Sequence, residues 1–141
     1  MDGFGTVDDV GWAPLIRAAE KARENAHAPY SRYAVGAALS CDDGSLVAGC
    51  NVENASYGAT ICAERNAIAH AVSNGRRAFR ACVVVTPGEV PVAPCGLCRQ
   101  VLAEFADDMP ILLLAAASGA KALVRLTELF PRGFRPADLG H

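Results

Sequence analysis

The stretches Cys62-Ala63-Glu64 and Pro94-Cys95-Gly96-Leu97-Cys98 organise the rest of this chain. Each lies at the start of an apolar, helix-like run, and together they supply three thiols and one carboxylate. A Cys-x-x-Cys pair with a third soft ligand from elsewhere in the chain indicates a zinc site. Three protein ligands leave one tetrahedral position for water, which is typical of catalytic rather than structural zinc. The carboxylate of Glu64 is then placed to handle the protons of that water.

The predicted position of both stretches at helix N-termini favours this interpretation. Unpaired backbone N–H groups and the helix dipole stabilise thiolates at such positions. Three thiolates more than neutralise Zn²⁺, so Arg65 is a candidate to offset the surplus charge by hydrogen bonding to a ligand sulfur. The Cys95–Cys98 pair alone would also fit a structural zinc site or a redox pair. No fourth ligand is evident, because no histidine has ligand-like spacing to the cysteines: His27, His70 and His141.

Composition limits both the fold and the partners. The chain has 141 residues, of which 52% are hydrophobic and 20% charged, so a compact domain is expected rather than disorder. The net charge of −2, without a run of lysine or arginine, weighs against nucleic acid as a partner. Residues 1–10 do not resemble a signal peptide, and the longest apolar run, residues 111–117, is too short for a membrane span. We therefore expect one cytoplasmic domain over residues 1–141, with no membrane partner.

The six cysteines of such a chain are expected to be thiols rather than disulfides. Three belong to the two stretches above. The other three lie in strand-like apolar runs, where free cysteine usually acts as a small buried hydrophobe: Cys41, Cys50 and Cys82.

Hydrophobic periodicity predicts an α/β fold. Helical spacing is found in three segments and strand-like apolar runs in five: helices at 12–26, 62–73 and 95–105, and strands at 33–40, 46–52, 79–86, 111–115 and 122–126. The first two strands form a hairpin, and strand 79–86, apolar on both faces, is expected to be central. The last two strands should be antiparallel, because about six residues are too few for a parallel crossover. A helical turn at 127–130 and an irregular tail complete a three-layer α/β/α domain with a five-stranded mixed sheet.

Four segments carry a resemblance to a known family. They are Tyr30 to Leu39, Asn51 to Gly58, Cys62 to Arg65 and Pro94 to Val101, in the family's order. They resemble the small, homotetrameric, zinc-dependent cytidine deaminases, and a zinc-bound Cys set with a non-ligating Glu and Pro-Cys-x-x-Cys is typical of base deaminases. The likeness runs from about residue 12 to 139. It implies hydrolysis of cytidine or 2′-deoxycytidine to the uracil nucleoside and ammonia, in pyrimidine salvage, with one Zn²⁺ per subunit.

The resemblance also implies roles for individual residues. Cys62, Cys95 and Cys98 would hold zinc, and Glu64 would shuttle protons while zinc-bound hydroxide attacks C4 of the base. Asn51 and Glu53 would bind the ribose hydroxyls, which suits an amide and a carboxylate. The remaining implied residues contact substrate or support the site: Tyr33 facing the pyrimidine, Ala63 beside it, Tyr57 and Phe134 reaching a neighbouring subunit's site, and Arg65 and Gln100 in support. Tyr33 departs from the family, which usually has phenylalanine there.

Three other functions remain open on the sequence. A deaminase of a modified cytosine nucleoside, such as a blasticidin-type antibiotic, shares the cysteine stretches but lacks the full stretch from Asn51 to Gly58, and one pocket residue can redirect specificity. A polynucleotide-editing enzyme would need basic surface or aromatic stacking platforms, and neither is evident. A purely structural zinc protein would have no use for Glu64. A small nucleoside is therefore the expected partner.

Overall fold

The computed structural model describes residues 3–140; His141, expected to be a frayed end, lies outside them. The elements follow the predicted order with small shifts at their ends: α1 (Trp12–Arg23), β1 (Gly36–Cys41), β2 (Leu46–Cys50), α2 (Ala63–Ser73), β3 (Phe79–Thr86), α3 (Gly96–Phe105), β4 (Pro110–Ala115), β5 (Lys121–Arg125) and α4 (Leu126–Leu129). Two 3₁₀ turns, Tyr57–Ala59 and Pro136–Leu139, lie in the loop before α2 and in the tail.

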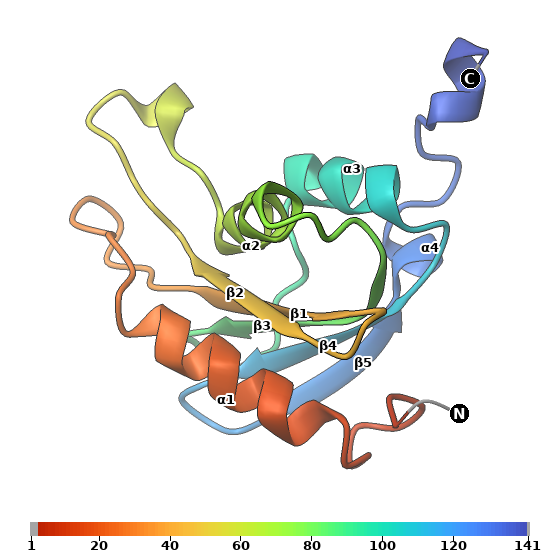
Figure 1. The fold of residues 1–141 in the computed structure, drawn as a ribbon. Helices are drawn as coiled ribbons and strands as arrows, with labels where there is room; N and C mark the ends of the chain where they lie inside the picture. Colours follow the sequence, from red (N-terminus) through yellow and green to blue (C-terminus); the bar gives the residue numbers. More distant parts are fainter. Residues whose placement is uncertain (1–2, 141) are drawn as a thin grey trace.

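The five strands form one mixed sheet in the order β2-β1-β3-β4-β5. The pair β3–β4 is parallel, because α3 crosses between them, and the neighbouring pairs are antiparallel. The predicted antiparallel end pair, β4–β5, and the central position of β3 are thereby confirmed. Figure 1 shows α1 on one face of the sheet and α2 and α3 on the other, which is the expected three-layer arrangement.

Alternate residues of the central strand serve two separate cores. Cys82 and Val84 belong to the core under α2 and α3, whereas Val83 and Val85 belong to the core under α1. All four side chains are buried, as the continuous apolar run predicts for a strand covered on both faces. Trp12, fully buried at the start of α1, closes the second core.

Two glycines allow helices to lie directly on the sheet. A Cβ atom at Gly49 of β2 would stand 2.5 Å from the backbone nitrogen of Ala67 in α2. A Cβ atom at Gly36 of β1 would stand 2.0 Å from the carbonyl oxygen of Ala19 in α1. Side chains larger than hydrogen cannot be accommodated at these distances, so the two glycines set how closely each helix approaches.

Two predictions, the end of the first helix and the wholly irregular tail, are wrong for identifiable reasons. Helix α1 ends at Arg23 rather than near residue 26, because His27 leaves the helix and exchanges backbone hydrogen bonds with Asn51 and Glu53. The tail is not wholly irregular, because Asp138 accepts a hydrogen bond from the Arg135 N–H and begins a 3₁₀ turn. Within the described residues, no helix combines the length and the apolar character that crossing a membrane requires.

Candidate active site

The three predicted metal ligands come together where two helices begin. Cys62 immediately precedes α2, Cys95 immediately precedes α3, and Cys98 lies in the first turn of α3. The Sγ atom of Cys95 lies 3.8 Å from that of Cys62 and 3.5 Å from that of Cys98, and all three sulfurs lie within 4.8 Å of one another. Tetrahedral coordination with Zn–S bonds of about 2.3 Å requires sulfurs roughly 3.8 Å apart. The donor set therefore fits zinc in both chemistry and spacing.

The surroundings of these thiols favour the thiolate form at Cys62. A hydrogen bond from Cys98 and the nearby Arg65 guanidinium lower the pKa of Cys62 to about 5, although burial opposes the shift. Arg65 donates from Nη2 to the Cys62 sulfur at 3.8 Å and to the Thr60 carbonyl at 3.3 Å. The hydrogen bond to Cys62, and after it burial, raise the pKa of Cys98, since one thiol must stay protonated to donate to the other. The predicted contact of Arg65 with a ligand sulfur is thus present.

Glu64 is a buried carboxyl group in the first turn of α2. Its side chain is only 5% exposed and lies next to the cysteine cluster. Burial, together with the negative charge of Cys62, raises the pKa of Glu64 to about 7. A carboxyl group with such a pKa can both accept and release a proton near neutral pH.

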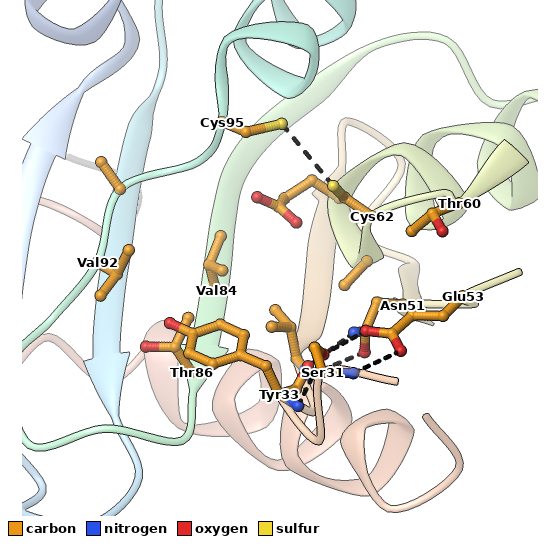
Figure 2. A pocket seen from close by; sticks show the side chains of 14 residues that line it. Ser31, Tyr33, Asn51, Glu53, Thr60, Cys62, Val84, Thr86, Val92 and Cys95 are labelled. Atoms are coloured by element: carbon orange, nitrogen blue, oxygen red, sulfur yellow. Dashed lines mark hydrogen bonds between the residues drawn. The ribbon is translucent and has the colours of Figure 1, made fainter. Parts of the chain in front are cut away.

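A cavity of about 570 Å³ opens beside this cluster (Figure 2). This volume lies within the range of about 300–1,000 Å³ that is usual for small-molecule sites. Its lining includes two of the predicted ligand cysteines, Glu64 and four of the predicted substrate-binding residues: Tyr33, Asn51, Glu53 and Ala63. Segments far apart in the sequence therefore converge on one hollow.

Asn51 and Glu53 hold the loop that forms one wall of this cavity. The Asn51 side chain accepts from the Val35 N–H at 2.9 Å and donates to the Tyr33 carbonyl at 2.7 Å. The Glu53 carboxylate accepts from the Ser31 hydroxyl and from the backbone N–H groups of Tyr30 and Ser31 at 3.0 and 3.1 Å. The Ser31 hydroxyl and these N–H groups lower the pKa of Glu53 against the effect of burial. Both side chains keep acceptor capacity toward the cavity.

Besides Cys98 and Arg65, which lie at the cysteine cluster, three predicted site residues do not line the cavity of their own chain. Tyr57 is 76% exposed on the loop before α2, where its ring packs edge-on against Tyr30 with centroids 6.0 Å apart. Phe134 is 55% exposed in the tail, which Figure 1 shows extending beyond α3. Gln100 donates to the Phe134 carbonyl at 2.8 Å and so supports the tail rather than the cysteine cluster.

Several lining residues were not predicted from the sequence. They are the apolar and hydroxyl-bearing side chains of the walls: Ser31, Val35, Thr60, Val84, Thr86, Val92 and Ala93. Val92 and Ala93 directly precede Pro94-Cys95, so their closeness to a metal ligand was a usable signal. Thr86 follows the apolar run 81–85 at the end of β3, and one hydroxyl at that position gave no reason to expect a site.

Comparison with known proteins agrees with this geometry. Residues 13–113 match the model of the cytidine and deoxycytidylate deaminase zinc-binding region, a span that includes all three cysteines and Glu64. The cytidine deaminase of Sporosarcina psychrophila is 46% identical over 127 residues, covering 90% of this chain and 93% of that protein. The cytidine deaminase of Mycobacterium tuberculosis is 51% identical over 142 residues, covering 94% and 96%. A blasticidin-S deaminase of Bacillus cereus is more distant, at 32% identity over 72% of this chain and 76% of that protein.

Solved structures show the same relationship. The crystal structure of cytidine deaminase from Burkholderia pseudomallei superposes with a TM-score of 0.82 at 45% identity, covering 86% of this chain and 97% of that one. A cytidine deaminase of Mycobacterium tuberculosis superposes with a TM-score of 0.76 at 41% identity, covering 89% and 98%. The match over residues 13–113, which contain the cysteine cluster and the buried glutamate, and the identity to these relatives show that the chain belongs to the zinc-binding cytidine and deoxycytidylate deaminase family.

Proposed function

We propose that this protein catalyses the hydrolytic deamination of cytidine and 2′-deoxycytidine. Water and the nucleoside give the corresponding uracil nucleoside and ammonia. The observation that carries the proposal is the buried Glu64 carboxyl group beside three clustered thiols, at one end of a cavity of nucleoside size. The cytidine deaminase relatives, which match along most of the chain, support the same substrate.

Cys62, Cys95 and Cys98 would hold the zinc ion. Zinc held by these thiolates supplies Lewis acidity, which makes water a nucleophile near neutral pH. Arg65 donates to the Cys62 sulfur and so withdraws electron density from it, which keeps the three-thiolate set from weakening that acidity. These residues prepare the site, whereas proton transfer falls to Glu64.

Glu64 would move protons among three atoms during the reaction. Its carboxylate would accept one proton from the attacking water and deliver it to the ring nitrogen N3. It would then take the remaining proton from the new hydroxyl group on C4 and pass it to the amine, so that ammonia leaves as the C4 carbonyl forms. Its pKa of about 7 suits both directions of transfer. The low exposure of the carboxyl group keeps bulk water from competing for these protons.

The remaining lining residues would orient the nucleoside. Asn51 and Glu53 retain acceptor capacity for the ribose hydroxyls while they hold the loop of Tyr33 in place. Tyr33 offers an aromatic face to the pyrimidine from that loop. Ala63, fully buried at the start of α2, leaves room for the base next to Glu64.

The test is an ultraviolet assay of cytidine with purified protein, combined with ammonia and zinc determination. Loss of cytidine absorbance, equimolar ammonia and about one zinc per chain are expected, since three thiolates form one site. If the protein held zinc but did not turn over cytidine, a deaminase of blasticidin-type nucleosides would be favoured. Blasticidin S is therefore tested in parallel, because a distant relative from Bacillus cereus is a blasticidin-S deaminase. Absence of zinc from freshly purified, folded protein would refute the proposal.

We also propose a homotetramer with sites shared between subunits, formed from a single catalytic domain over residues 1–141. Tyr57 and Phe134 are exposed and lie outside their own cavity, which fits a role in a neighbouring site. Apolar Val52 and Val90 are also exposed and could be covered by a partner. Light scattering of the purified protein tests the tetramer directly.

The proposed zinc site requires free thiols, which the reducing cytoplasm preserves, and we propose the cytoplasm as the location.

A further inference from the structure

The loop that leads into Cys95 is held by few hydrogen bonds. Residues 87–95 connect β3 to α3 without forming a helix or strand, and Val92 and Ala93 of this loop line the cavity. The first part of the loop accepts hydrogen bonds from the turn after β4. Among the described residues, the only hydrogen bond that reaches positions 90–94 comes from the Arg99 side chain. The hydrogen bonding of this part of the cavity wall therefore depends on one guanidinium group.

Arg99 joins this loop to α4. The residue is half-buried in the first turn of α3, where its Nε–H group donates to the Pro94 carbonyl at 2.8 Å. Its Nη1 atom donates to the Leu129 carbonyl, at the end of α4, at 2.7 Å. Because proline has no N–H group, its carbonyl is the backbone group through which Pro94 can be held. Hydrogen bonds from a charged donor are also roughly twice as strong as neutral ones.

Helix α4 is itself firmly fixed. Leu126 is fully buried in the core under α2 and α3, and its N–H group donates to the Met109 carbonyl at 3.0 Å. The Asp108 carboxylate accepts from the Thr127 N–H group at 3.1 Å and from Arg125 Nε at 2.8 Å. A loop joined to such an element is restrained by the core, even though the loop has no secondary structure of its own.

We propose that Arg99 is a positioning residue, which fixes Cys95 by holding the preceding loop against α4. The inference rests on the zinc site of the proposed function. Cys95 is the exposed member of the cysteine cluster and lies before α3, whereas Cys98 is buried within the helix. Removal of the Arg99 side chain therefore frees Cys95 and the adjoining cavity wall before it disturbs the other two ligands.

The experiment measures how fast zinc-loaded protein releases Zn²⁺ to an excess of a chromogenic chelator, in wild type, Arg99→Met and Arg135→Met. Arg135 is the matched control, because it is also half-buried and donates to three backbone carbonyl groups within residues 103–107, at the opposite end of α3. Loss of a group that supports a metal ligand costs about 10–100-fold in metal affinity. Since Arg99 acts through the backbone, we expect release about tenfold faster in Arg99→Met, and release at the wild-type rate in Arg135→Met.

Two further measurements separate positioning from general loss of stability. With Co²⁺ in place of zinc, the ligand-field absorption reports the geometry of the thiolates; it should change in Arg99→Met and match wild type in Arg135→Met. Elastase, which cleaves after small side chains, reports the mobility of the loop. With zinc in excess, cleavage within residues 90–93, located by mass spectrometry, should be several-fold faster in Arg99→Met than in Arg135→Met.

Equal zinc release from the two variants, an unchanged Co²⁺ spectrum or equal loop cleavage would each overturn the proposal. If Arg99→Met does not fold, Arg99→Lys, which keeps the charge without the forked donor group, is measured in the same way and should change in the same direction. Wild-type protein that held no zinc would instead refute the proposed function, so the two failures are distinguishable.

Discussion

Substitution of Gly49 by alanine should damage a site that Gly49 does not touch. Gly49 lies in β2 beneath α2, and α2 begins directly after Cys62 and carries Glu64 in its first turn. An added Cβ would stand 2.5 Å from the Ala67 nitrogen and 2.9 Å from the Ala63 carbonyl oxygen. Both are backbone atoms, so no side-chain rotation relieves the clash.

The magnitude follows from the distance that α2 must move. Ordinary contact requires a retreat of about 1 Å. Overpacking of this kind costs about 1–3 kcal/mol, which lowers Tm by roughly 3–12 °C in a chain of this size. A displacement of about 1 Å at catalytic groups can lower the rate about 100-fold. We therefore expect Gly49→Ala to fold, with reduced Tm and kcat/KM for cytidine lowered by about two orders of magnitude.

The matched control is Gly88→Ala, because a Cβ at Gly88 would meet no atom within 4 Å. Gly88 lies in the loop between β3 and α3. Steady-state kinetics and thermal unfolding are measured on both variants. If Gly49→Ala retained the Tm and kcat/KM of Gly88→Ala, close packing of α2 on β2 would not be what positions Glu64.

Three further substitutions test the site and the fold. Glu64→Gln should remain folded and zinc-loaded but lose several orders of magnitude in kcat, since proton transfer is removed; near-normal turnover would exclude Glu64 from the mechanism. Cys98→Ala should lose zinc, measured by elemental analysis, and unfold at lower temperature, because metal binding and folding are coupled; full zinc retention would require a different ligand set. Asp108→Asn should cost about 1 kcal/mol at neutral pH, because hydrogen bonds from Thr127 and Arg125 lower the pKa of Asp108 although burial raises it. That stability is present above the ordinary pKa of Asp and disappears as pH falls through the lower folded-state value, so urea unfolding of the two proteins should converge as the pH is lowered through that value.

Most of the fold could be predicted because hydrophobic periodicity is local. The continuous apolar run of β3 predicted a central strand, and the short connection after β4 predicted its antiparallel partner. Element ends were less predictable where a distant segment competes for the backbone. His27 leaves α1 to pair with residues near Val52, and no pattern within residues 12–26 indicates that partner.

The cysteine cluster and Glu64 could be predicted because their spacing reflects coordination chemistry directly. The roles of Asn51 and Glu53 were predicted from the family resemblance. Their hydrogen bonds to the loop of Tyr33 could not be anticipated, since these bonds join residues 16–23 positions apart in the sequence. Thr86 was missed because a hydroxyl at a strand end is common. Its lack of a partner becomes visible only when the surrounding walls are placed.

The alternation of side chains along β3 constrains how this protein can change during evolution. Insertion or deletion of one residue within the strand would reverse the face of every residue beyond it. Val84 and Thr86 would then turn toward α1 and leave the cavity. Changes in chain length are therefore tolerated only in the connections, and the connections before α2 and before α3 border the cavity. Substrate range can diverge through these loops while the length of the central strand stays constant.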